Sequence, residues 1–414
     1  MTGRSVLVGS PVTRPRAVNA VGLLQSTAIN ARVLLVPLQA SGLGASPVDV
    51  GFLFATLAVA QASLAIPAGL MADRFGRRPM IFLALAAGLL GALLAAVGDI
   101  PILFVSQGLA GLSQGAAQTV LFSAVASAAP PRRLGSAFAA QVMANQTGLL
   151  LGPGLAGAAL AVLDTRTTFA LCALPLLAAV PIALLGIGAG PTTRGSGVPL
   201  RSALGDLAGS ESVSAAALLT VLMTGTWGVQ TAFLPLFAHE DVRLTASQIG
   251  FLLALQALTN VGARIPAGWL LDRIPERRRV YVAGACVGTF ALGLAAVPHT
   301  NAFWQLALVV CVTTPILGTA SVALPALFAR SSPAGRAGVA MGLYGLCQAV
   351  GSGVGPSVFG PAMTRGFDVG FSAGAVTGTV LSLGAMVAEV WSRRMRLSAH
   401  EATPEPLSSG TRTS

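Results

Sequence analysis

The chain has 414 residues, of which 54% are hydrophobic and only 9% are charged, and its mean hydropathy is +0.77. A soluble domain carries about 25% charged residues, so this composition excludes a soluble protein of this size. The net charge is +11, but the basic residues lie between apolar runs, and we expect no binding of nucleic acid. In lipid the backbone must satisfy its own hydrogen bonds, which leaves helices or a closed β-barrel.

The length of the apolar runs distinguishes these two folds. Transmembrane helices need about 20 apolar residues, whereas the strands of a barrel are about half as long and alternate in polarity. The runs in this chain have the helical length, so we predict an all-α integral membrane protein. In chain order, about twelve segments have spanning length: 18–41, 48–70, 79–98, 102–124, 137–162, 168–190, 213–238, 247–270, 280–298, 302–328, 338–362 and 368–391.

The arginines predict the orientation of these spans. With the N-terminus in the cytoplasm, twenty of the 25 basic residues fall in cytoplasmic segments, and only Arg166, Arg243 and Arg365 fall in outer loops. The remaining two, Arg32 and Arg264, lie inside spans. Basic residues of short loops stay on the cytoplasmic side. We therefore expect a multi-pass protein of the cytoplasmic (inner) membrane with both termini in the cytoplasm.

The sequence also repeats itself. IPAGLMADRF begins at Ile66 and IPAGWLLDRI begins at Ile265, 199 residues later, and VGFLFA from Val50 matches IGFLLA from Ile249 at the same offset. The segments LGPGLAG, from Leu151, and VGPSVFG, from Val354, form a second pair, and both contain the pattern GPxxxG. These matches predict two copies of a six-helix unit, over 1–190 and 213–392. A cytoplasmic linker over 191–212, rich in Gly, Ser, Thr and Pro, joins them, and a cytoplasmic tail follows over 393–414.

The run GLMADRFGRR, which begins at Gly69, resembles the motif between the second and third helices of the major facilitator superfamily. The second copy, from Gly268, is degenerate. The resemblance extends over nearly the whole chain and is closest to the bacterial twelve-helix transporters. It implies two pseudo-symmetric six-helix bundles with the substrate site between them, near the middle of the membrane.

In that family the motif is a conformational latch, whose contacts form in one state and break in the other. Carried over to this sequence, the latch residues are Gly69, Asp73, Arg74, Gly76, Arg77, Arg78, Asp272 and Arg273. For Arg77 and Arg78, simple anchoring at the cytoplasmic surface is an equal alternative. The stretch GLLLGPGLAG resembles the antiporter motif of the fifth helix, although Ala156 replaces a glycine. The expected helix-packing positions are Gly152, Pro153, Gly157, Gly355, Pro356 and Gly360.

Polar residues are unevenly distributed among the spans. They are sparse in 79–98, 168–190, 280–298 and 368–391, so these four spans should lie at the periphery, and the others should surround a path. The predicted cavity residues are Gln25, Arg32, Gln107, Gln114, Asn145, Trp227, Gln256, Asn260, Arg264 and Gln348. For any single amide, a role in holding helices together is the alternative.

Arg32 and Arg264 lie well inside their spans, and no Asp or Glu occurs at that depth. A buried arginine stays charged and needs a partner. One hypothesis is that both arginines face the cavity and attract an anionic or acceptor-rich substrate. The alternative is that they bind carbonyls and amides such as Asn30 and Asn260 and hold the helices in place.

These features favour a secondary active transporter that exports a small organic solute by alternating access. Uptake of an organic anion and a non-transporting receptor on the same scaffold are the alternatives. An enzyme is not expected, because the spans carry no catalytic triad or paired carboxylates, and without lysine the chain has no ATP-binding P-loop. The expected partners are the substrate, the bilayer and a coupling proton, although Gln107 stands where proton-coupled exporters of the family carry an arginine. We expect a monomer without metal or cofactor.

Overall fold

A computed structural model describes residues 13–128, 134–188, 211–330 and 337–401, and these residues form helices and short connecting turns. Nine of the described helical segments are long and apolar enough to cross a membrane by length and composition. Three further helices of similar length, α4 (Ile100–Ala128), α5 (Leu134–Leu160) and α13 (Ala337–Met363), lie among them and carry several polar side chains. The all-helical membrane fold is therefore confirmed.

The first part of the chain forms one group of packed helices. Besides α4 and α5, its helices are α1 (Pro15–Gly42), α2 (Pro47–Phe75), α3 (Arg77–Ala95), α6 (Thr165–Leu171) and α7 (Ala173–Gly186). The segment expected as one span over 168–190 is thus two helices that meet at Cys172 and end at Gly186. Pro175 follows the junction, and a proline has no N–H to donate to the carbonyl four residues earlier, so the first turn of α7 cannot continue α6.

Asp164 directly precedes α6, the first of these two helices. Its side chain caps α6 and accepts hydrogen bonds from the backbone N–H groups of Arg166 and Thr167. The hydroxyl and the N–H of Thr167 hold the pKa of the Asp164 carboxyl below its usual value. The ionised form therefore stabilises the turn that connects α5 to α6.

The second part of the chain forms the other group. Its helices, besides α13, are α9 (Glu211–Glu240), α10 (Ala246–Arg273), α11 (Glu276–Leu294), the short 3-10 helix η2 (Val297–His299), α12 (Phe303–Arg330) and α14 (Phe367–Glu401). The last helix continues ten residues beyond the expected end of its span at 391. Part of the expected tail is thus helical, and the expected linker falls mostly outside the described residues.

The internal repeat reappears in local structure. A capping box begins α2, where Ser46 and Asp49 each bind the backbone N–H of the other, and a second one begins α10, where Thr245 and Gln248 do the same. Ser46 and Thr245 are 199 residues apart, which is the offset found in the sequence. Each cap satisfies otherwise unpaired N–H groups at a helix start.

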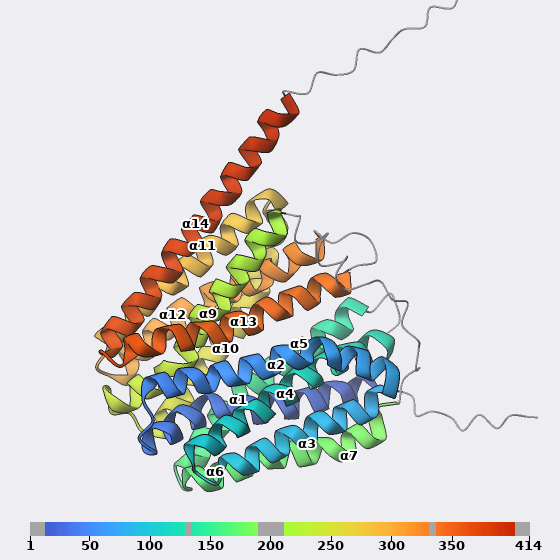
Figure 1. Ribbon diagram of the computed structural model, residues 1–414, viewed down its shortest axis with the longest axis vertical. Helices are drawn as coiled ribbons and strands as arrows, with labels where there is room; N and C mark the ends of the chain where they lie inside the picture. The colour runs from blue at the N-terminus through green and yellow to red at the C-terminus, as the bar shows by residue number, and fades with distance from the viewer. Residues whose placement is uncertain (1–12, 129–133, 189–210, 331–336, 402–414) are drawn as a thin grey trace, which may run out of the picture.

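The packing partners follow the same symmetry. Within the first group α1 packs against α5 and α2 against α4, and within the second α9 packs against α13 and α10 against α12. The two groups meet mainly where α2 contacts α13 and α5 contacts α10. Figure 1 shows the helices of the two groups converging at one end and spreading apart towards the end at which α14 projects. We call the end with residues 69–78 and 268–279 the motif face, and the end with the turns 42–47 and 240–246 the far face.

Candidate functional site

A cavity of about 390 Å³ lies between the two helix groups. Its lining residues come from α1, α2, α4 and α5 on one side and from α9, α10, α12 and α13 on the other. None comes from α3, α6, α7, α11 or α14, which agrees with the peripheral position expected for those spans. The volume is within the range of about 300–1,000 Å³ that is typical of sites for small molecules.

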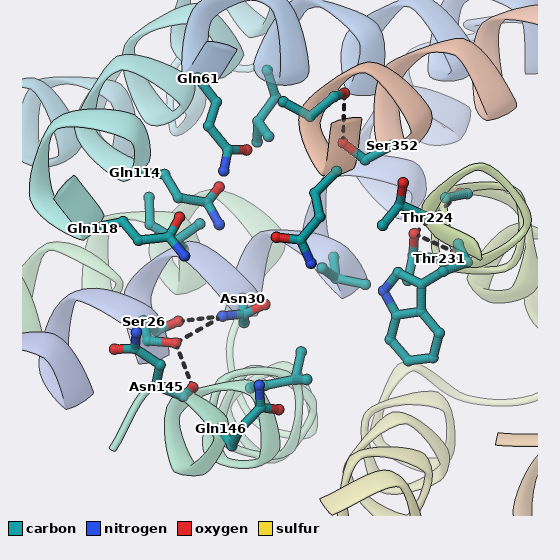
Figure 2. A pocket seen from close by; sticks show the side chains of 18 of the residues that line it. Ser26, Asn30, Gln61, Gln114, Gln118, Asn145, Gln146, Thr224, Thr231 and Ser352 are labelled. Carbon is teal, nitrogen blue, oxygen red and sulfur yellow. Dashed lines mark hydrogen bonds between the residues drawn. The ribbon is translucent and has the colours of Figure 1, made fainter. Parts of the chain in front are cut away.

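The wall formed by the first group is rich in amides. Figure 2 shows Gln61, Gln114 and Gln118 projecting from α2 and α4, while Asn30 and Gln146 lie on the opposite side of the view. Ser26 on α1 donates to the backbone carbonyl of Asn145 on α5 (2.7 Å), and Asn30 in turn donates to Ser26. The bond from Ser26 to Asn145 fixes α1 against α5 beside the cavity.

Two amides of this wall are incompletely paired. Gln25 and Gln146 both line the cavity, and each has one buried side-chain atom without a hydrogen-bond partner among the described residues. The atoms are Nε2 of Gln25, which donates, and Oε1 of Gln146, which accepts. A buried unpaired polar atom costs about 1–3 kcal/mol, so a bound solute that satisfies these atoms gains affinity.

Arg32 lies at the edge of the cavity, and its head group has protein partners. Its Nε donates to Oε1 of Gln107 (3.0 Å), and its Nη2 donates to the hydroxyl of Ser106. The guanidinium also lies 5.8 Å from the centre of the Phe169 ring. Only 3% of the residue is exposed. The contacts of Arg32 thus join α1 to α4 and α6, as expected for an arginine that holds helices in place.

Arg264 on the opposite wall is different. Its Nη2 donates to Oδ1 of Asn260 one turn earlier (3.1 Å), but its Nε is buried and has no acceptor among the described residues. Asn260 itself donates weakly to the carbonyl of Thr314 on α12 (3.4 Å). Arg264 therefore lines the cavity with a positively charged group whose buried Nε has no acceptor among the described residues.

The rest of this wall combines hydroxyl groups with one large ring. Thr224 and Thr231 project from α9, and Ser352 projects from α13 (Figure 2). Trp227 of α9 also lines the cavity. Gln348 on α13 donates to the hydroxyl of Tyr344 (3.1 Å). The described residues that line the cavity include no Asp, Glu or His, so the wall carries two positive charges and no negative one.

Nine of the ten predicted cavity residues line this cavity. Gln256 does not, because it is 2% exposed and donates to Oε1 of Gln230 on α9 (2.8 Å), where it borders a much smaller pocket. The expectation for Gln256 is therefore corrected: a second amide one helix away satisfies it. The prediction missed Gln61, Gln118 and Gln146, which also line the cavity. Gln61 is the only amide of its span, and an amide in an otherwise mostly apolar helix is itself a sign of a cavity position.

The far-face side of the cavity is closed by glycines that touch the opposite group. A Cβ on Gly250 of α10 would lie 2.6 Å from the Cα of Gly157 and 2.7 Å from the carbonyl oxygen of Pro153, both on α5. By symmetry, a Cβ on Gly51 of α2 would overlap the carbonyl of Pro356 on α13. Only glycine permits backbones to approach so closely.

These contacts unite the two repeated patterns of the sequence. Gly51 and Gly250 belong to the paired VGFLFA and IGFLLA segments, and each meets the GPxxxG segment of the other half. Gly360 also faces the opposite group, since a Cβ there would lie 3.1 Å from the Cα of Val48. The remaining two glycines pack within their own half: Gly152 against Thr27 and Ala31 of α1, and Gly355 against Gly225 of α9.

A polar contact lies beside this closure. The hydroxyl of Ser41 at the end of α1 donates to Oε1 of Glu240 at the end of α9. The two residues are 199 positions apart, so they are equivalent positions of the repeat. Equivalent positions contact each other only near the axis that relates the halves, and this pair therefore marks the axis at the far face.

The latch residues lie at the opposite end. Gly76 has φ +92°, which favours glycine, and connects α2 to α3. Arg77 donates to the hydroxyl of Ser123 (3.1 Å) and Arg78 to the carbonyl of Leu184 (2.6 Å), both in the first helix group. Gly69 approaches Thr119 of the same group.

The other predicted latch residues lie at the ends of α2 and α10. Arg74 is exposed and lies over the ring of Phe75, and Asp272 and Arg273 are exposed at the end of α10. The backbone of Asp73 belongs to α2, but its side chain is outside the described part of the structure. The hydrogen bonds from Arg77 to Ser123 and from Arg78 to Leu184 thus join helices of one group, and the latch function stays a prediction.

The cavity opens towards the motif face. Gln118, which lines it near the motif-face end of α4, is exposed, and a Cβ on Gly262 or Gly268 of α10 would meet none of the described residues within 4 Å. The same helix is in tight contact at Gly250 near the far face. The two groups are therefore apart at one end of the cavity and together at the other.

This arrangement matches a known family. The sequence model described as Major Facilitator Superfamily matches residues 20–356. The chain belongs to the major facilitator superfamily. No curated protein matches the sequence.

Solved structures share the superfamily fold at low sequence identity. The nucleoside transporter NupG (D323A mutant) superposes with a TM-score of 0.76 at 10% identity, covering 91% of this chain and 98% of its own. A POT family transporter in complex with a thioalcohol-conjugated peptide gives 0.76 at 14% identity, with 90% and 95% covered. A bacterial homologue of the human lysosomal transporter Spinster, in an inward-facing and unoccupied conformation, gives 0.71 at 14% identity, with 93% and 97% covered.

Proposed function

We propose that this superfamily member is a secondary active transporter that moves a small polar organic solute across the cytoplasmic membrane by alternating access. The observation that carries the proposal is the cavity of about 390 Å³ between the halves, closed at the far face by glycine contacts and open at the motif face. Such contacts hold one state and must separate in the other. If the arginine distribution gives the orientation, the present conformation faces the cytoplasm.

We propose export as the direction. GLLLGPGLAG resembles the antiporter motif of the superfamily, and its Pro153 and Gly157 form the contact with Gly250 that closes the far face. A tight far-face closure favours the cytoplasm-facing state at rest, and in that state an exporter binds its solute. The composition of the cavity argues against an organic cation as the solute, because its lining carries two arginines and no described carboxylate.

Uptake of an organic anion is the second candidate. It is favoured by the unpaired Nε of Arg264, which gives the cavity an anion-binding donor whatever the direction of transport. The coupling ion is a separate question. The described cavity lining contains no Asp, Glu or His to carry a proton, so a coupling proton, if used, binds elsewhere in the protein or on the solute.

The test compares cells that express the wild type, a Gly250→Leu variant or no transporter. Leucine at Gly250 cannot fit against Gly157, so the far face cannot close and the transport cycle stops. Mass spectrometry of medium and cell extracts then measures solutes without choosing one in advance. Export predicts a solute that accumulates in the medium with the wild type alone. Uptake predicts a solute that is depleted from the medium with the wild type alone. A receptor predicts identical solute profiles in all three strains, and that result would refute transport.

A further inference from the structure

The polar groups of the cavity differ in how far the protein itself satisfies them. Arg32 donates to Gln107 and Ser106 and faces the ring of Phe169. Arg264, by contrast, has a buried Nε without an acceptor among the described residues, and its Nη2 donates to an amide one turn away. Of the two arginines, Arg264 is therefore the one whose hydrogen bonding a ligand would complete.

The unpaired atoms of the two halves lie at a similar depth. Gly157 of α5 and Gly250 of α10 touch near the far face and give a common origin. From there Gln146 is about 16 Å along α5, and Asn260 and Arg264 are about 15 and 21 Å along α10, at 1.5 Å per residue. Both helices line the cavity beyond that contact. Gln146 and Arg264 thus face one space from opposite halves.

We propose that the solute is an organic carboxylate that binds between these two helices, an inference that rests on the proposed transport function. The carboxylate accepts hydrogen bonds from Nε and Nη2 of Arg264, with Asn260 holding the guanidinium in place. A hydroxyl or amide group at the other end of the solute donates to Oε1 of Gln146 and accepts from Nε2 of Gln25. The planar edge of a guanidinium matches a carboxylate in two parallel hydrogen bonds.

The remaining lining restricts the solute further. Trp227 offers a large flat surface from α9, so a ring or other flat apolar part between the two polar ends would be well accommodated. No described carboxylate lines the cavity to repel the anion. The matching probes are therefore small aromatic acids, with and without a hydroxyl group opposite the carboxylate.

The experiment measures binding of four probes to the purified full-length protein: 4-hydroxybenzoate, 4-hydroxybenzamide, benzoate and phenyl phosphate. We expect 4-hydroxybenzoate to bind about 10- to 100-fold more tightly than its uncharged amide. This factor is the usual contribution of hydrogen bonds to one charged group. Benzoate should bind more weakly than 4-hydroxybenzoate because it leaves Gln146 unpaired. The Arg264→Gln variant should lose the preference for the acid over the amide.

Two further variants keep the result interpretable. Arg264→Lys keeps the charge but not the planar edge, so it should retain part of the preference, even if Arg264→Gln folds poorly. Arg365→Gln removes an exposed charge far from the cavity and should bind the probes as the wild type does. Thermal unfolding without ligand identifies any variant that is simply unstable.

Several results would overturn the proposal: equal affinity for acid and amide, no binding of either acid up to its solubility limit, tighter binding of phenyl phosphate than of benzoate, or an unchanged preference in Arg264→Gln. Transport is judged separately in liposomes loaded with 4-hydroxybenzoate. Binding that depends on Arg264 without any movement across the liposome membrane would support the carboxylate site and refute the transport function.

Discussion

The glycine contact between α5 and α10 gives a prediction about conformational balance. In Gly250→Ala the new Cβ would lie 2.6 Å from the Cα of Gly157, and since ordinary contacts begin near 3.4 Å, the two helices must separate by roughly 0.8 Å. Both neighbours are backbone atoms, which cannot rotate away. Overpacking of this kind costs about 1–3 kcal/mol. If the cost falls only on the state closed at the far face, the ratio of the two states changes about 5- to 150-fold.

Spin labels on the far face measure this ratio. Leu43 and Asp241 are exposed on the far-face turns of the two halves, so cysteines at these positions carry labels without filling the contact. The four native cysteines are first replaced: Cys172, Cys286, Cys311 and Cys347. Pulsed electron paramagnetic resonance should give mainly a short label separation in the parent protein. A population with a longer separation should appear in Gly250→Ala.

Gly262→Ala on the same helix is the matched control. In the part of the chain that the structure describes, a Cβ at Gly262 would meet nothing within 4 Å, so this change tests the effect of an alanine in α10 without a new contact. Its distance distribution should equal that of the parent. If Gly250→Ala and Gly262→Ala give the same distribution, the close approach of α5 and α10 does not control the far face, and the reasoning is wrong.

Four other predictions follow from the same structure. Arg32→Lys should lower the free energy of unfolding by about 1–3 kcal/mol in thermal melts, because an ammonium cannot serve both Gln107 and Ser106 as the guanidinium does. Ser46→Ala and Thr245→Ala should each cost about 1 kcal/mol in the same assay, since each removes one side of a capping box. Affinity for 4-hydroxybenzoate should stay constant between about pH 6 and 8.5, where the acid is ionised and arginine does not titrate, and a marked pH dependence would place a titrating group in the site. Alkaline phosphatase fused to the C-terminus should be inactive if the C-terminus is cytoplasmic, and active enzyme there would reverse the predicted orientation.

Much of the architecture follows from two features that can be read along the whole sequence: the apolar runs and the uneven distribution of amides. Apolar runs of spanning length predict membrane helices, because lipid offers the backbone no partners. The unequal distribution of amides predicts which helices surround the cavity, because a polar side chain facing lipid is costly. Gln114 and Gln348, which are more than 200 residues apart in the sequence, both line the cavity.

Two of the features that the sequence did not predict depend on pairs of side chains. Polarity places Gln256 near the interior, but it does not say whether another amide, here that of Gln230, satisfies it. The same limit applies to the arginines. Arg32 and Arg264 look alike as isolated charges in apolar spans, and only the positions of Gln107 and Ser106 separate a satisfied arginine from an unsatisfied one. The break at Cys172 lies within a single apolar run, where hydropathy gives no sign of it.

The positions of the contacts on α10 connect binding with movement. The helix carries Gly250 in the far-face closure and Arg264 at the cavity wall, about 21 Å away along its axis. A solute held by Arg264 alone contacts one half of the protein, and these contacts are the same in both conformational states. Such a solute does not shift the equilibrium, because a ligand favours a state only when it binds that state more tightly. A solute that also binds Gln146 joins α10 to α5 and favours a state in which the motif-face ends approach. The two-ended chemistry inferred for the solute is therefore what conversion to the other state requires, and benzoate, which lacks the second end, should bind but be transported more slowly than 4-hydroxybenzoate at saturation.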